Sequence, residues 1–175
     1  LVTQNGLSIR FRSDDVRSTG RNTQGVRGIS LTDTDVVIGM APTIEGKNLL
    51  VISEKGFGKR TELDEYRIQT RGGKGLITYK PSEKTGLLVG LALVDDDNDL
   101  VIINDLGIMI RISASEVPVL SRITQGVTLM RVRDGKVVDL ACVDREACED
   151  EEEELAEDTD ETSAVEISDT EQTDS

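Results

Sequence analysis

The architecture of this chain is clearest in the stretch "LVISEKGFGKRT" (Leu50–Thr61). An apolar strand is followed by a turn that ends in glycine and by a second strand that carries basic residues, which is typical of a β-hairpin. The same pattern occurs in "LVTQNGLSIRF" (Leu1–Phe11) and in "LVIINDLGIMIRI" (Leu100–Ile112). The turn glycines, which lie 50 and 51 residues apart, are Gly6, Gly56 and Gly107. The chain therefore repeats one hairpin with a period near fifty residues.

A second motif keeps the same spacing, in "NTQGVRGISL" (Asn22–Leu31), "RGGKGLITYK" (Arg71–Lys80) and "ITQGVTLMRV" (Ile123–Val132). Its aligned glycines, again 50 and 51 residues apart, are Gly25, Gly75 and Gly126. A repeat of this length with several short strands indicates an all-β, propeller-like array, in which each unit buries its faces against its neighbours. The predicted domain is 1–143, with units near 1–48, 49–98 and 99–143. Strand alternation in the third hairpin predicts that Ile108, Ile110 and Ile112 face the core.

Charge is distributed very unevenly along the 175 residues, whose net charge is −14. Residues 144–175 hold 16 of the 34 acidic residues and only Arg145 among the 20 basic ones, which leaves 18 acidic and 19 basic residues in 1–143. Such a dense acidic segment cannot bury a core, so 144–175 is predicted to be a disordered tail. Two roles remain open for it, a solubilising tail and an internal polyanion that competes with nucleic acid for basic residues.

Basic residues recur at matching positions of the repeats, on the second hairpin strand and ahead of the second glycine. Stacked units would align these positions along one outer edge, where they could contact phosphates without reading bases. Only 2% of the residues are aromatic, which disfavours single strands because those require stacking platforms. The predicted DNA contacts are Arg10, Arg12, Arg21, Lys59, Arg60, Arg71, Lys74, Arg111 and Arg122.

Other classes of function find little support in the composition. The chain has no histidine, and two cysteines five residues apart, Cys142 and Cys148, make neither a disulfide framework nor a zinc site. The segment "RGGKG" (Arg71–Gly75) could cradle a phosphate but lacks the spacing of a nucleotide-binding loop. We therefore predict no catalytic residue, no metal site and no cofactor within this chain. No apolar run is long enough to span a bilayer, so no membrane partner is expected.

The repeats resemble the C-terminal domain of the A subunits of bacterial DNA gyrases. The similarity covers about Leu1–Val143 and rests on "NTQGVRGI" (Asn22–Ile29), "GFGKRT" (Gly56–Thr61), "GLLVGLALVDD" (Gly86–Asp96) and "ITQGV" (Ile123–Val127). It implies a six-bladed β-pinwheel, of which about the last three blades and the acidic tail are present here. Blades of a pinwheel exchange a strand with their neighbours.

The resemblance also implies a function. The basic rim would wrap duplex DNA within an A2B2 type IIA topoisomerase of the cytoplasm, which introduces negative supercoils. The partners would be double-stranded DNA, a second A subunit and the B subunit, and ATP and Mg²⁺ would act through the B subunit. The cleavage tyrosine of the family lies in another domain, so Tyr66 and Tyr79 are interpreted as structural.

One heptapeptide is similar to the signature box of gyrase A subunits and departs from it at Thr70. It comprises Gln69, Thr70, Arg71, Gly72, Gly73, Lys74 and Gly75. The box of the family belongs to the first blade, and this copy lies in the second repeat of the chain, so its role carries over only in part. The alternatives are the C-terminal domain of a topoisomerase IV A subunit, which acts in decatenation, and a propeller that binds proteins.

Overall fold

The computed structural model describes residues 1–32, 34–43 and 47–145. The chain divides into a compact unit, Leu1–Cys142, and the remainder, Val143–Ser175. The predicted disordered tail falls, from residue 146 onward, outside the described residues.

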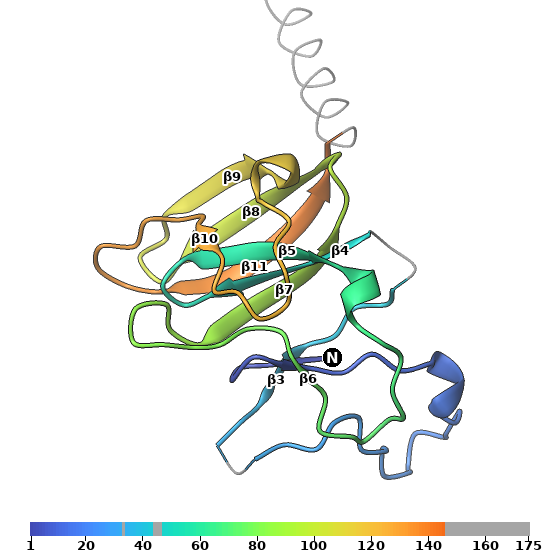
Figure 1. The fold of residues 1–175 in the computed structure, drawn as a ribbon. Coiled ribbons are helices and arrows are strands. Elements are labelled where there is room, and N and C mark those ends of the chain that lie inside the picture. The colour runs from blue at the N-terminus through green and yellow to red at the C-terminus, as the bar shows by residue number, and fades with distance from the viewer. Residues whose placement is uncertain (33, 44–46, 146–175) are drawn as a thin grey trace, which may run out of the picture. The chain divides into compact units, whose positions relative to one another are not determined.

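The described residues form an all-β fold, as predicted (Figure 1). The first repeat contributes β1 (Val2–Thr3), β2 (Leu7–Ser8) and β3 (Val37–Gly39). The second contributes β4 (Asn48–Ser53), β5 (Phe57–Glu62), β6 (Leu76–Ile77) and β7 (Leu88–Val94). The third contributes β8 (Asn98–Asn104), β9 (Met109–Ser113), β10 (Val127–Thr128) and β11 (Val137–Asp144). A single 3-10 turn follows each hairpin: η1 (Ser13–Asp15), η2 (Leu63–Glu65) and η3 (Ala114–Glu116).

The first two sheets are shared between consecutive repeats. The strand orders are β3-β1-β2-β6, β10-β5-β4-β7 and β11-β8-β9. In the first two sheets, the hairpin and the last strand of one repeat are completed by a short strand of the following repeat, β6 or β10. The strand exchange expected of a pinwheel is therefore confirmed there, whereas the third sheet, among the described residues, contains strands of the third repeat alone.

Hairpin glycines allow this exchange because they bring two repeats into direct backbone contact. Gly6 and Gly56 have φ angles of +83° and +78°. A Cβ atom added to Gly56 would lie 2.1 Å from the carbonyl oxygen of Met130 in the next repeat. The equivalent atom on Gly6 would lie 2.1 Å from the carbonyl oxygen of Tyr79. Both the left-handed conformation and the close approach require glycine at these turns.

Each hairpin turn is also held by one side-chain oxygen, which accepts a hydrogen bond from the backbone N–H four residues later in the chain. Thr3 Oγ1 accepts from the Leu7 N–H at 3.0 Å, and Ser53 Oγ accepts from Phe57 at 3.2 Å. In the third repeat Asn104 Oδ1 accepts from the Ile108 N–H at 2.8 Å. Threonine, serine and asparagine differ in shape, yet each supplies an oxygen at the same place.

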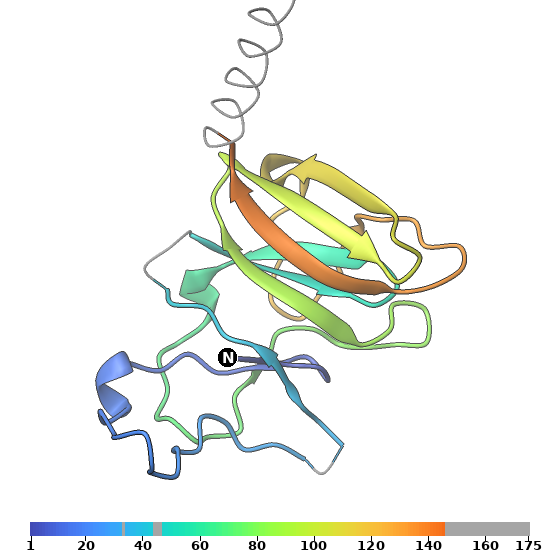
Figure 2. The same cartoon turned by 180° about the vertical axis from the view of Figure 1, so that it is seen from behind.

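The core lies between successive sheets. One apolar cluster joins the second and third sheets through residues such as Leu50, Ile52, Leu100 and Ile102, which are fully buried. Figure 2 shows β8 and β11 of the third sheet beside β7 of the second. Another cluster joins the first and second sheets and contains both tyrosines. Tyr66 and Tyr79 are buried there, in keeping with their predicted structural role.

One core prediction was wrong. Ile110 and Ile112 pack against the core as the alternation predicts, but Ile108 is exposed. The equivalent positions of the other repeats, Leu7 and Phe57, are partly covered because a strand of the following repeat pairs beside them. The described part of the chain holds no such strand next to β9.

The glycine contact gives a first prediction. Gly56→Ala should destabilise the fold by roughly 2 to 5 kcal/mol, because left-handed strain adds to overlap with a backbone carbonyl. Gly72→Ala is the matched control, since Gly72 has φ +81° but its added Cβ would keep 3.5 Å from its nearest neighbour. Gly72→Ala should therefore cost only about 1 to 2 kcal/mol. Urea unfolding of the wild type and both variants measures the loss of unfolding free energy. Equal losses in the two variants would refute the close approach of Gly56 to the Met130 carbonyl.

Candidate nucleic-acid interface

In the first two repeats, an arginine on or just after the second hairpin strand reaches the following repeat. The Arg10 guanidinium donates to the carbonyl oxygens of Leu63 at 2.9 Å and Tyr66 at 3.4 Å, and so caps η2. In the next repeat, Arg60 Nε donates to the Val117 carbonyl at 2.7 Å, beside η3. Arg10 and Arg60 thus hold the 3-10 turn of the following repeat against the hairpin that precedes it.

Backbone contacts repeat in the same way. The Gln69 N–H donates to the Arg10 carbonyl and the Leu120 N–H donates to the Arg60 carbonyl, both at 2.8 Å. Arg60 is only 5% exposed and also pairs with Asp96 at 2.5 Å, which lowers the pKa of that carboxyl. We call this set of contacts between a hairpin and the following repeat the repeat joint.

Lys59 lies inside the joint between the second and third repeats. Its side chain is fully buried, and Nζ donates to the carbonyl oxygens of Ser121 at 2.7 Å and Arg122 at 2.6 Å. Burial lowers the pKa of Lys59 to about 8. A neutral amine has two N–H donors and an ammonium has three, so either form of the Lys59 side chain can donate to both carbonyl oxygens.

The arginine ahead of the second glycine makes a further contact between repeats. Arg71 donates from Nη1 to the Arg27 carbonyl at 2.5 Å and from Nε to the Asp15 carbonyl at 3.1 Å. Arg122 donates from Nη1 to the Ile77 carbonyl at 3.2 Å. Both guanidinium groups therefore bridge consecutive repeats, while parts of both side chains stay accessible.

These contacts give several of the predicted DNA contacts partners within the chain. Lys59 and Arg60 are buried, and Arg10 is half-buried with its guanidinium on the carbonyls of η2, so the structure gives all three a role in the joints. Arg111 pairs with Asp99 at 2.8 Å and keeps 42% of its side chain exposed. Of the predicted contacts, Arg12, Arg21 and Lys74 lie exposed on the part of the chain that the structure describes.

The heptapeptide Gln69–Gly75 forms a tight turn, in which Gly72 and Gly75 have positive φ angles. The Gly72 N–H, which could have faced an anion, donates instead to the Gly28 carbonyl at 2.7 Å. Lys74 is exposed on this turn. The segment therefore contributes a cation to the surface, and at Gly72 it contributes a contact between repeats.

A stronger basic feature lies in the segments that cross from each hairpin to the next sheet. These crossing segments are residues 16–31, 66–80 and 117–133, and together they contain ten basic and no acidic residues. All ten are exposed or partly exposed: Arg17, Arg21, Arg27, Arg67, Arg71, Lys74, Lys80, Arg122, Arg131 and Arg133. The absence of acidic residues is the signal that could have identified this surface from the sequence.

The three crossing segments lie next to one another, which can be followed in blue, green and orange in Figure 1. The Ser30 N–H donates to the Gly73 carbonyl at 2.8 Å and joins the first segment to the second. Gln125 Nε2 donates to the Lys80 carbonyl at 3.1 Å and joins the second to the third. We call the basic residues of these three joined segments the basic band.

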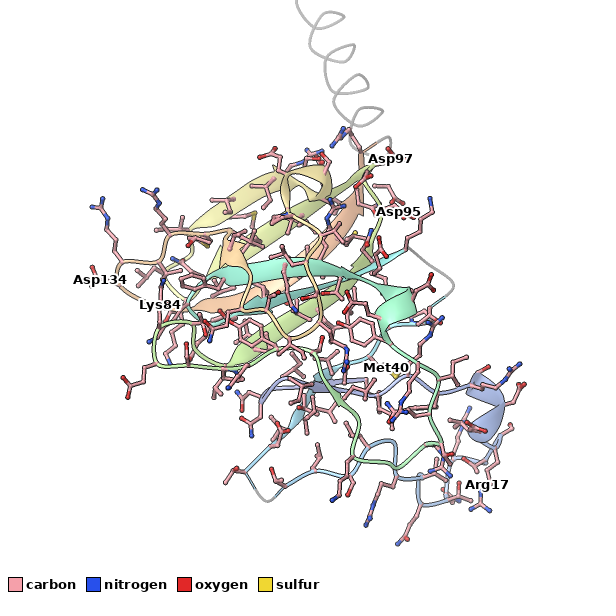
Figure 3. All side chains as sticks on the ribbon, in the orientation of Figure 1. Arg17, Met40, Lys84, Asp95, Asp97 and Asp134 are labelled. Atoms are coloured by element: carbon pink, nitrogen blue, oxygen red, sulfur yellow. The ribbon has the colours of Figure 1, made fainter. Side chains whose placement is uncertain are left out.

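Acidic residues lie outside the crossing segments, some of them directly at their ends, such as Asp15, Glu65 and Glu116. Figure 3 shows Asp95 and Asp97 on the turn between β7 and β8, and Asp134 on the loop before β11, whereas Arg17 lies on a crossing segment. The crossing segments therefore carry a local excess of positive charge, with carboxylates at their boundaries, among them Glu65, which accepts from the Arg122 N–H at 2.8 Å. Such a surface attracts polyanions and can hold phosphates through exposed, adaptable side chains.

Other chemistry is not supported by the described residues. They contain no group of three or more histidine, cysteine, aspartate or glutamate residues that could hold a metal ion. No helix in this part of the chain is long and apolar enough to cross a membrane.

Lys59 gives a second prediction. Because its pKa falls from 10.5 to about 8 on folding, the unfolded chain binds more protons between these pH values, and stability should rise with pH there. Relative to Lys59→Met, the wild type should gain about 3 kcal/mol of unfolding free energy between pH 8 and pH 10.5. Urea unfolding at several pH values measures the difference. A constant difference would show that Lys59 titrates normally.

Comparison with known proteins identifies the family. The family model for the DNA gyrase C-terminal domain, a beta-propeller, matches three successive parts of the chain, residues 1–44, 47–95 and 98–144. These ranges follow the fifty-residue period and cover most of the chain.

Two relatives at the sequence level are DNA gyrase A subunits. That of Clostridium acetobutylicum is 50% identical over 157 residues, which covers 87% of this chain and 19% of the relative. That of Lawsonia intracellularis is 43% identical over 141 residues, which covers 79% of this chain and 17% of the relative. The chain thus spans less than a fifth of the length of these relatives.

Solved structures agree with this result. A DNA gyrase A C-terminal domain superposes with a TM-score of 0.77 at 27% identity, covering 81% of this chain and 48% of that domain. The C-terminal domain of a DNA topoisomerase IV has a TM-score of 0.75 at 19% identity, covering 83% of this chain and 46% of the other, which shows a shared fold. With three matched repeats, exchanged strands and these relatives, the chain belongs to the DNA gyrase C-terminal domain family.

Proposed function

We propose that this chain is the part of a DNA gyrase A subunit that binds and wraps duplex DNA. The observation that carries the proposal is the basic band, in which three hydrogen-bonded crossing segments present ten cations and no carboxylate. Most of these side chains are exposed, so they can reach phosphates without opening the fold.

Duplex DNA fits this surface better than a single strand or a small ligand. The cations are spread over three repeats, which matches a long and regular array of phosphates. Phosphate contacts of this kind position the duplex without reading its bases. Both tyrosines are buried, so neither offers a stacking surface for unpaired bases.

Wrapping follows from the repeated arrangement. Successive repeats present equivalent segments, so DNA that follows them must bend, and contacts with the backbone must offset the bending energy. In the holoenzyme, the wrapped duplex supplies the segment that passes through the DNA gate, and negative supercoils result.

The proposal places the chain in an assembly. It belongs to a cytoplasmic A2B2 enzyme that contains a second A subunit and two B subunits. The B subunits bind ATP and Mg²⁺, and no residue of this chain is assigned to either. Arg12 adds to the basic surface beside η1.

A topoisomerase IV A subunit is the second candidate, because its C-terminal domain has the same fold. The two candidates differ in the reaction of the assembled enzyme. With its A subunit carrying this domain, a gyrase converts relaxed plasmid to negatively supercoiled plasmid, whereas a topoisomerase IV unlinks catenated circles without introducing supercoils. Relatives named gyrase at up to 50% identity favour the first candidate.

The basic band gives a third prediction. A variant with Arg67→Gln, Lys74→Gln and Lys80→Gln should bind duplex DNA more weakly than the wild type. The slope of log affinity against log salt concentration should fall by about 3, because each neutralised phosphate contact contributes about 0.9. Fluorescence anisotropy with a labelled duplex over a salt series measures both quantities.

The matched control removes the same charge from elsewhere. Lys47, Lys55 and Lys84 are exposed and lie outside the crossing segments. Changing these three to glutamine should leave the salt slope nearly unchanged. If both triple variants lose affinity equally, net charge alone governs binding and the basic band is not the interface.

A further inference from the structure

Aliphatic side chains lie exposed among the cations of the basic band. Ile68 and Ile77, on the second crossing segment, are 56% and 48% exposed, and Val119, on the third, is 44% exposed. Each lies within three residues of a basic residue of the band. Single exposed aliphatic residues are common on protein surfaces. These three call for an explanation because neighbouring repeats surround them and still leave them accessible.

Ile68 and Val119 occupy the same position of successive repeats. Arg10 forms a parallel bridge with Ile68, and Arg60 forms the same bridge with Val119. The third crossing segment lies beside the second and yet leaves Ile68 exposed, so the following repeat does not cover this position. The complete hairpin of β4 and β5 precedes Val119 and leaves it exposed as well, so the preceding repeat does not cover it either. The position therefore stays open between two neighbouring repeats.

Ile77 has neighbours on both sides. Its backbone pairs with Leu7 of the first repeat, and its carbonyl oxygen accepts from Arg122 Nη1 of the third repeat at 3.2 Å. In the sequence it stands between Lys74 and Lys80, which are both exposed. The guanidinium of Arg122 places a cation directly beside this aliphatic residue. An anionic ligand of that cation would therefore lie close to Ile77.

The shape of a duplex determines which of its groups these side chains can reach. Lysine and arginine carry their charges on long, flexible stems, whereas isoleucine and valine are short. A duplex whose phosphates are held by the cations would bring only its outermost apolar groups, the C–H groups of the deoxyriboses, against the aliphatic residues. Bending compresses the groove that faces the protein and brings the sugars of both strands toward it. The base edges on the groove floor would stay out of reach.

We propose that Ile68, Ile77 and Val119 pack against the deoxyribose groups of bound duplex DNA. The inference rests on the proposed function and adds to it a part of the affinity that does not depend on salt. Apolar contacts release no counterions, so they raise the affinity without changing its salt slope. A ribose would turn its 2′-hydroxyl toward an aliphatic side chain that cannot hydrogen-bond to it. The three residues thus favour a DNA duplex over an RNA duplex.

A triple variant of the full chain tests the proposal. Ile68→Thr, Ile77→Thr and Val119→Thr replace apolar groups by hydroxyls and keep the β-branched shape that suits extended backbone. Fluorescence anisotropy with a labelled DNA duplex over a salt series gives the slope and, by extrapolation to 1 M salt, the salt-independent affinity. That affinity should fall roughly tenfold, and the slope should stay unchanged.

Two controls and a second ligand sharpen the experiment. Val36→Thr with Val138→Thr makes the same kind of change at exposed valines outside the crossing segments and should bind like the wild type. Ile68→Val with Ile77→Val keeps an apolar surface and should retain most of the affinity. An RNA duplex of the same sequence should lose little affinity on the threonine substitutions. Circular dichroism verifies that each variant is folded.

The outcomes separate this inference from the proposed function. If the wild type binds duplex DNA with a steep salt slope and the folded threonine variant binds equally well, the apolar contact is refuted and the proposed function stands. A wild type that does not bind duplex DNA removes both. Equal losses for DNA and RNA refute the contact with deoxyribose. A smaller salt slope in the threonine variant, or an equal loss in the valine control, refutes a separate apolar contribution from these three residues.

Discussion

The structure depends on the hydrogen bonds and close backbone contacts that join the first and second hairpins to the repeat that follows each of them. Arg10 and Arg60 donate to carbonyl oxygens beside the next 3-10 turn, while Gly6 and Gly56 admit a carbonyl at a distance that no side chain would tolerate. Hydrogen bonds from a charged donor are stronger than those between neutral groups, and these are partly shielded from water. Strand exchange, core stacking and the continuity of the basic band all follow from this contact.

The repeat period explains how much of the fold was predictable. Glycine spacing located the hairpins, and strand alternation identified Ile110 and Ile112 as core-facing, because both are local properties of the chain. The prediction for Ile108 was wrong. Its exposure depends on whether another strand lies beside β9, and no local pattern contains that information.

The predicted binding residues illustrate a different limit. A basic residue that recurs in each repeat can bind a ligand or can hydrogen-bond to a neighbouring repeat. Its spacing along the sequence is the same for both roles, so the spacing does not distinguish them. Arg60 and Lys59 turned out to serve the neighbour, whereas Lys74 is exposed. The composition of whole segments was more informative, since the crossing segments contain ten basic residues and no carboxylate, whereas the 3-10 turns directly before them are acidic.

Strand exchange also has a consequence for how the protein is made. The first sheet lacks β6 until residues 76–77 exist, and the second lacks β10 until residues 127–128 exist. On the ribosome, a hairpin therefore emerges with an open edge and waits for about 70 more residues before its sheet is complete, since Leu7 pairs with Ile77 and Phe57 with Thr128. Proteins of this kind are vulnerable to misassembly in that interval. Pauses in translation within a crossing segment would lengthen the wait, so the speed of synthesis along these segments bears directly on the yield of correctly assembled domain.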